Sequence, residues 1–311
     1  MIGPVSKSSV LLFLTLVAAS TAAAQRPGAK PRPGDDVESV PARKPAASHP
    51  APSVNVPERA RYRVTLVGFR VNRETYDTFL ETDGKGDEIR LAAQVQEFGP
   101  NGEAVAPPRE VQSAVYGDRN TFPSRIAAGS RSAKGGLKTG DNVPAVSDPW
   151  VRREAPQPDR LPLLLWEGEL RTNQNMVAIS PTVWELDSDD LLNAPANVVI
   201  GVGDVVKSVG PIAAMIPGIG GLSRALMNVT KPAAAFAANV KERGNRPVGL
   251  APAGGKLSFT PSVVGLTTTT AELVIAGQGG ARSPGVIEVR YTDSEDLKGD
   301  YSLFLQVERL P

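Results

Sequence analysis

Alternating apolar and polar residues predict several β-strands along the chain. In RYRVTLVGFRV (residues 61–71), apolar residues alternate with polar ones from Tyr62 onwards, and the phase shifts at Gly68. Such alternation with β-branched residues is typical of a half-buried strand, and a glycine at the phase shift indicates a β-bulge. EIRLAAQVQEF (residues 88–98) predicts a second strand. We expect the two to pair across the acidic segment between them.

Later apolar runs predict further strands. LPLLLWEGEL and NMVAISPTVWEL (residues 161–170 and 175–186) are joined by the turn-like RTNQ, which favours a hairpin. Between residues 104 and 161 only EVQSAVYG has the character of a strand, so this region is interpreted as a long loop region. Four C-terminal runs predict four more strands: KLSFTPSVVG, TTAELVIAG, GVIEVRYT and DYSLFLQVERL (256–265, 269–277, 285–292 and 300–310).

Residues 191–240 differ from the rest because they are mostly Ala, Val, Ile, Gly, Met and Leu, with prolines as breaks. This composition favours two or three short helices that are buried on several sides. Strands, then helices, then strands again are typical of an antiparallel sheet protein with a helical insertion. We therefore predict a mainly β protein, an antiparallel β-sandwich over residues 59–311 with an Ala/Gly-rich helical insertion at 191–240 and a long loop region at 104–161.

The N-terminal residues predict export. Residues 1–24 combine an early lysine, a short apolar run and Ala22-Ala23-Ala24, the pattern of a secretory signal peptide. The run is shorter than the roughly 20 residues that span a bilayer, which favours a cleaved signal over a retained anchor. Residues 25–58 are rich in Pro, Ala, Lys, Arg and Ser and predict a disordered tether. A secreted or periplasmic location follows.

Composition excludes most enzyme chemistry. The single histidine, His49, lies in the predicted tether, and the chain has no cysteine. A Ser-His-Asp triad, a cysteine nucleophile, a histidine base and the usual zinc site all need residues that the predicted domain lacks. The net charge of +1, with dispersed bases, gives no case for nucleic acid. GIGGLS (218–223) has a serine where a dinucleotide fingerprint has its third glycine.

Without disulfides, stability has to come from a large core or from a bound ion. Three acidic segments adjoin strand-like runs, at residues 77–88, 187–190 and 293–300. Calcium binds six to eight oxygens, which loops at one end of a sandwich can supply. The predicted ligands are Asp83, Asp87, Glu88, Asp187, Asp189, Asp190, Asp293 and Asp296. The same residues are typical of solvated turns, so both interpretations stay open. An EF-hand is excluded, since aligning Gly84 with its invariant glycine puts Phe79 at the first ligand position.

Three of these segments support a resemblance. ETDGKGDEIRL, PTVWELDSDD and KGDYSLFLQVERL (81–91, 181–190 and 298–310) are similar to segments of uncharacterised exported bacterial proteins, and a sandwich with acidic loops resembles C2-type calcium-binding domains. The resemblance implies a C2-like β-sandwich and carries no enzymatic activity to this chain. C2 domains lack an insertion like residues 191–240, and this chain departs from them there.

The leading interpretation is a secreted, non-enzymatic binding or structural protein whose acidic loops bind calcium for stability or for contact with an unknown protein or surface ligand. One alternative is membrane docking through the apolar residues 197–229, whose small residues would let helices pack closely in lipid. Another is a glycoside hydrolase that uses carboxylates alone. Trp166-Glu167 and Trp184-Glu185 each pair a ring with a carboxylate, and that chemistry needs two carboxylates about 5 to 9 Å apart.

Overall fold

The protein is mainly β, since 52% of the described residues are in strands and 5% are helical, which confirms the predicted mainly β class. The structure is a computed structural model, and Pro52–Pro311 form one unit of it, separate from Met1–Ala51. The predicted signal peptide and most of the predicted tether lie outside the described residues. The described residues are 54–75, 86–117, 125–129, 136–186, 198–200, 246–253, 256–259, 262–293 and 298–311.

The first large sheet, called here the β1 sheet, is built around β1 (Arg59–Arg73). On one edge β1 pairs antiparallel with β14 (Asp300–Arg309), and β13 (Val286–Thr292) follows beyond it. On the other edge, β6 (Leu163–Arg171) pairs with the first half of β1 and β5 (Asn142–Val143) with the second half. β1 is therefore the central strand of its sheet.

The predicted bulge in β1 is confirmed, because the register with β14 shifts between Leu66 and Gly68. A Cβ atom built on Gly68 would lie 2.1 Å from the carbonyl oxygen of Pro149, so only glycine fits beneath this segment. The nearby Trp150 ring contacts Phe304 of β14 edge-on, with 5.2 Å between centroids. Part of the long loop region thus covers the outer face of the β1 sheet.

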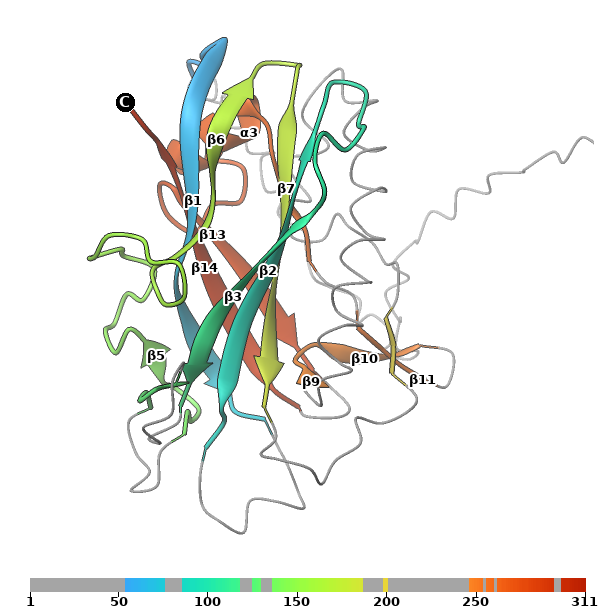
Figure 1. The fold of residues 1–311 in the computed structure, drawn as a ribbon. Helices are drawn as coiled ribbons and strands as arrows, with labels where there is room; N and C mark the ends of the chain where they lie inside the picture. The colour runs from blue at the N-terminus through green and yellow to red at the C-terminus, as the bar shows by residue number, and fades with distance from the viewer. Residues whose placement is uncertain are drawn as a thin grey trace, which may run out of the picture. The chain divides into compact units, whose positions relative to one another are not determined.

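The second large sheet, called here the β7 sheet, has the order β12-β7-β2-β3-β4, and β9 also pairs with β7. Its pairs are antiparallel except β3 with β4, which run parallel. Figure 1 shows this sheet in front of the β1 sheet. Its strands are β2 (Ile89–Phe98), β3 (Arg109–Tyr116), β4 (Arg125–Ile126), β7 (Met176–Glu185), β9 (Arg246–Pro247) and β12 (Val264–Leu266).

Both predicted hairpins are wrong. β1 and β2 belong to different sheets, and so do β6 and β7. The acidic segment after β1 and the short turn after β6 therefore carry the chain from one sheet to the other. Apolar alternation shows that a strand has a buried face, but it does not show which strand lies beside it.

Two other expectations change. TTAELVIAG, predicted as a strand, forms most of helix α3 (Thr268–Ile275), because Thr267 and Thr270 make a capping box and the helix buries Ala271 and Val274. In the predicted helical insertion, the described residues form the strand β8 (Val198–Ile200), parallel to β11. The rest of that insertion lies outside the described residues. β8 belongs to a small sheet with β10 (Leu250–Ala253) and β11 (Lys256–Phe259).

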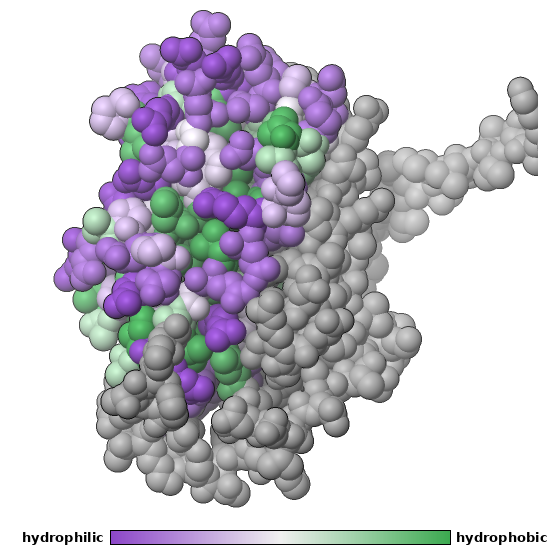
Figure 2. Space-filling view, in the orientation of Figure 1, coloured by the Kyte–Doolittle hydropathy of each residue, from purple (hydrophilic) through white to green (hydrophobic). Residues whose placement is uncertain are grey.

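The core takes side chains from both large sheets, which pack against each other. Tyr62 and Leu66 of β1 lie in one buried cluster with Leu91 of β2 and Ile179 of β7. Every residue of β7 is buried, so this strand is covered on both faces. Figure 2 shows apolar residues exposed mainly in scattered positions, and hydrophilic residues over the end where β1 begins.

Candidate functional site at the loop-bearing end

The described residues that border two acidic segments are bonded to each other. Thr75, just after β1, donates its backbone N–H to Asp87 Oδ2, just before β2, at 2.8 Å. Leu186, just after β7, donates its N–H to the carbonyl oxygen of Glu88 at 2.9 Å. The segment between β1 and β2 and the segment after β7 therefore begin beside one another.

The third acidic segment begins at the same end. Arg73 of β1 donates from Nη2 to the carbonyl oxygen of Asp293 at 3.0 Å and from Nε to that of Lys298. Asp293 and Lys298 border the residues between β13 and β14. The roots of all three acidic segments thus meet where β1 and β7 end and where β2 and β14 begin, at the lower end of Figure 1. We call this region the loop-bearing end.

Four buried polar side chains join the two sheets at this end: Thr75, Asp87, Glu185 and Tyr301, named here the carboxylate cluster. Their exposed fractions are 3%, 7%, 6% and 0%. Tyr301 is on β14 and Thr75 follows β1, whereas Glu185 ends β7 and Asp87 precedes β2. The cluster is therefore a polar bridge across the core where the acidic segments start.

The hydroxyl of Thr75 lies between two carboxyl groups. Thr75 Oγ1 is 2.9 Å from Asp87 Oδ1 and 2.5 Å from Glu185 Oε1, and the Tyr301 hydroxyl donates to Asp87 Oδ2. A threonine hydroxyl has one hydrogen and can donate it to only one of the two carboxyl groups. The second contact is a hydrogen bond only if a carboxyl group carries a proton.

Burial sets the protonation of this cluster. Burial raises the pKa of Asp87 to about 6, even though hydrogen bonds from Tyr301 and Thr75 act to lower it. Burial and the neighbouring Asp87 carboxylate also raise the pKa of Tyr301, which therefore remains a hydrogen-bond donor. The cluster thus favours an additional proton at mildly acidic pH.

The predicted calcium ligands have different surroundings. Asp87 is in the carboxylate cluster, and Glu88 Oε2 pairs with Arg125 Nη1 at 3.1 Å. Asp293 is fully buried, and its backbone N–H donates to the carbonyl oxygen of Gly299 at 2.8 Å. Within the described part of the chain, no group of three or more acidic or histidine side chains is placed to hold a metal ion. The other predicted ligands lie outside it: Asp83, Asp187, Asp189, Asp190 and Asp296.

The two glutamates considered for glycoside hydrolysis are far apart. Glu167 pairs with Arg63 near the start of β1, whereas Glu185 contacts Thr75, twelve residues further along the chain. At about 3.3 Å per residue, and with two bulges shortening β1, the stretch from Arg63 to Arg73 alone spans on the order of 25 Å, which exceeds the 5 to 9 Å that the reaction needs. The structure does not bring this pair together.

The sequence analysis did not identify Thr75 and Tyr301 as site residues. The alternation of DYSLFLQVERL places Tyr301 in the same inward row as Leu303 and Leu305, which is a signal for burial. It gives no information on the residue that Tyr301 faces, because Asp87 comes from the other sheet. Glu185 was considered only for catalysis.

Comparison of the chain with protein-family models, curated proteins and solved structures finds no match. The resemblance to C2-type domains therefore stays a prediction. Among the described residues, no helix has the length and apolar character to cross a membrane. Most of residues 197–229, on which the membrane alternative depends, lies outside them.

Proposed function

We propose that this chain is an exported, non-enzymatic β-sandwich that binds a divalent cation at its loop-bearing end, with calcium as the expected ion. The main support is the meeting, at one end of the two packed sheets, of the described residues that border three acidic segments. Calcium needs more oxygens than one short segment supplies, and converging segments can provide them together. The bound ion would stabilise the domain or shape a surface for a protein or another surface ligand.

The carboxylate cluster gives this proposal a second support. Asp87 and Glu185 both contact the hydroxyl of Thr75 and both are buried, and burial disfavours ionising two neighbouring carboxyl groups at once. A cation held by the neighbouring acidic segments would favour the ionised form of Asp87 and lower the pKa of its carboxyl group. Calcium and a proton are therefore expected to compete at this end of the domain.

Burial of the cluster also supports a role other than catalysis. Each of its four side chains is at most 7% exposed, which leaves no access for a substrate. Their hydrogen bonds connect the ends of strands from both sheets, so the cluster holds the roots of the acidic segments in place. We infer that it positions the segments and does not itself react.

Thermal unfolding in calcium and in chelator tests the proposal. An ion that binds only the folded chain stabilises it by mass action, by about 2.7 kcal/mol at a concentration of 100 Kd. We expect the melting temperature in millimolar calcium to exceed that in EDTA. Equal midpoints in the two conditions would contradict the proposal.

A set of substitutions locates the ion. The triple variant Asp83→Asn, Asp189→Asn and Asp296→Asn removes one carboxylate from each acidic segment, and we expect it to lose the calcium-dependent shift. Asp159→Asn is the control, since this exposed carboxylate pairs with the neighbouring Arg160 and belongs to none of the three acidic segments. It is expected to keep the full shift.

A further inference from the structure

A row of arginines lies on the outer face of the β1 sheet, near the start of β1. Arg59, Arg61 and Arg63 alternate with Tyr62 and Val64, which point into the core. β6 continues the row in register, because Arg171 lies opposite Arg59, Glu169 opposite Arg61 and Glu167 opposite Arg63. Strand alternation therefore presents these charges together on one face.

The row contains two neighbouring networks of ion pairs, one around Glu167 and Glu308 and one around Glu169. Glu167 contacts Arg61 at 3.0 Å and Arg63 at 2.8 Å. Glu308 contacts Arg63 at 3.2 Å and Arg152 at 2.8 Å, while Glu169 contacts Arg171 at 2.6 Å and Arg59 at 3.8 Å. We name this set the arginine stripe: Arg59, Arg61, Arg63, Arg152 and Arg171 with Glu167, Glu169 and Glu308.

The arginine stripe has more cations than anions. Each of its three carboxylates is shared by two of its five guanidinium groups, so these eight residues have a net charge of +2. The side chains of Arg59, Arg61 and Arg171 are 66%, 58% and 50% exposed. A guanidinium has five N–H donors, and its contact with a shared carboxylate uses only some of them. Donors and positive charge therefore remain available to a ligand in solution.

Stability alone does not account for this arrangement. Exposed ion pairs contribute little to stability, and three carboxylates would already be balanced by three arginines. The hydrogen bond from Arg171 holds the pKa of Glu169 below its usual value, so this carboxylate stays ionised and keeps the arginines ordered. The glutamates thus space the guanidinium groups along the strand.

We propose that the arginine stripe binds a linear acidic polysaccharide through its sulfate or carboxylate groups. Guanidinium pairs with such oxyanions in a bidentate geometry that lysine cannot reproduce. Alternate residues of a strand repeat at about 6.6 to 6.8 Å, which presents the arginines at regular intervals to an extended polymer. None of the eight side chains of the stripe is aromatic, whereas binding of single-stranded nucleic acid uses base stacking on aromatic rings.

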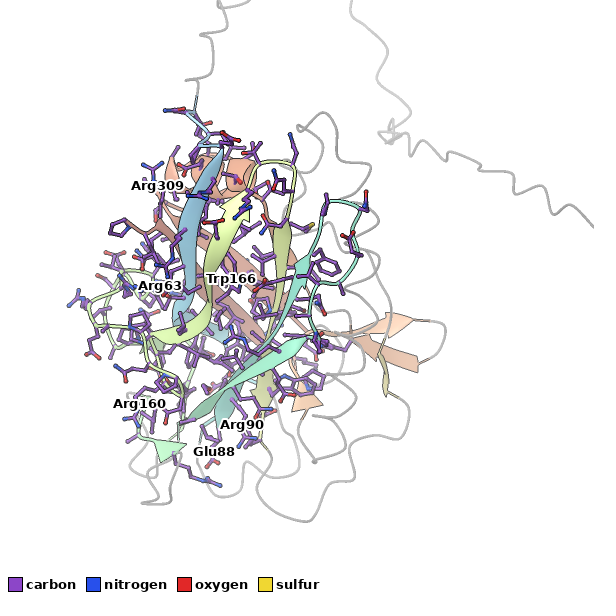
Figure 3. All side chains as sticks on the ribbon, turned by 45° about the horizontal axis from the view of Figure 1, so that its top comes forward. Arg63, Glu88, Arg90, Arg160, Trp166 and Arg309 are labelled. Carbon is purple, nitrogen blue, oxygen red and sulfur yellow. The ribbon has the colours of Figure 1, made fainter. Side chains whose placement is uncertain are left out.

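This site is separate from the loop-bearing end. Figure 3 shows Arg63 beside β1, well above Glu88 at the lower end of the view. Polysaccharide binding is therefore expected to be the same in calcium and in EDTA. This independence separates the present inference from the proposed function, because either one can fail without the other.

Binding to dextran sulfate at low salt, measured by titration calorimetry on the full chain, tests the inference. Arg61→Gln and Arg160→Gln form a matched pair, since both arginines are 58% exposed and Arg160 pairs with Asp159 outside the stripe. We expect Arg61→Gln to weaken binding several-fold and Arg160→Gln to leave it unchanged. The combined variant Arg59→Gln, Arg61→Gln and Arg171→Gln is expected to weaken binding at least tenfold and to reduce the salt dependence.

Three results would overturn the inference. They are an absence of binding by the natural chain, equal effects of Arg61→Gln and Arg160→Gln, and tighter binding to a single-stranded oligonucleotide than to dextran sulfate of equal charge. If the triple glutamine variant unfolds, the corresponding triple lysine variant replaces it. That variant keeps the charge but loses bidentate pairing, and we expect it to bind more weakly than the natural chain.

Discussion

The loop-bearing end and the arginine stripe concentrate charged groups of opposite sign in different surroundings. In the carboxylate cluster, two carboxyl groups share the hydroxyl of Thr75, and all four side chains are buried. In the stripe, five guanidinium groups share three carboxylates that are partly exposed to solvent. Burial makes an unbalanced group change its protonation, whereas exposure lets the excess charge act on a partner. The same domain thus has one region that responds to pH and one that is suited to recognition.

The largest expected effect in this comparison is on the free energy of unfolding at the cluster. Thr75→Val keeps the side-chain shape but removes the hydroxyl that both carboxyl groups contact. Because buried charged groups then lose a hydrogen-bond partner, we expect a loss of about 2 to 4 kcal/mol at pH 7 in urea unfolding. A loss below about 0.5 kcal/mol would show that the cluster does not hold the two sheets together.

The next largest effect is the change with pH in the free energy of unfolding that Asp87 causes. The folded pKa of Asp87 is about 6, above its ordinary value of 3.8, so the folded chain binds more protons than the unfolded chain between these values. The contribution of Asp87 to the free energy of unfolding therefore falls as pH rises from about 4 to about 6, by about 2 to 3 kcal/mol. Urea unfolding of the natural chain and of Asp87→Asn at each pH isolates this contribution as the difference between their free energies of unfolding. A constant difference across this pH range would contradict the assignment.

A smaller effect on the free energy of unfolding is expected at Asp300, which precedes Tyr301 of the carboxylate cluster on β14. Burial acts to raise the pKa of Asp300, but hydrogen bonds from Arg290 and Asn72 bring it below its ordinary value. This carboxylate stabilises the fold above its unfolded pKa, and the contribution is lost as pH falls through the lower folded pKa. Arg290→Gln is expected to cost about 1 kcal/mol at pH 7 and less at pH 2 in urea unfolding. An equal cost at both pH values would exclude this pairing as its cause.

The smallest effect is expected at the stripe. Arg61→Gln removes one of two guanidinium groups on Glu167, and Arg63 remains to pair with it. We expect a change within about 0.5 kcal/mol in the same urea experiment. A loss as large as that of Thr75→Val would mean that the stripe is a structural element.

The sequence predicts buried faces better than neighbours. The alternation around Tyr62 and the phase shift at Gly68 predicted β1 and its bulge, since both depend on local backbone and burial. The pairing of β1 with β14 joins distant parts of the chain, and no local pattern reports it. Helix α3 was missed because its capping box outweighs the strand character of TTAELVIAG.

In the candidate sites, too, the sequence indicates individual residues but not their neighbours. The sequence named Asp87 because it stands in an acidic run, but its contact with Tyr301 depends on two sheets closing over one core. Arg59, Arg61 and Arg63 are visible as an alternating row, yet their ratio to carboxylates depends on β6 and β14 lying on either side. The sequence alone therefore does not show which charged side chains lie next to one another in the folded protein.

Calorimetric titration of the full chain with calcium at pH 7 tests the central claim most directly. We predict a saturable heat of binding for the natural chain, retained by Asp159→Asn and lost in the Asp83→Asn, Asp189→Asn and Asp296→Asn triple variant. No binding heat at several temperatures from a natural chain that is shown to be folded would contradict a cation site at the loop-bearing end.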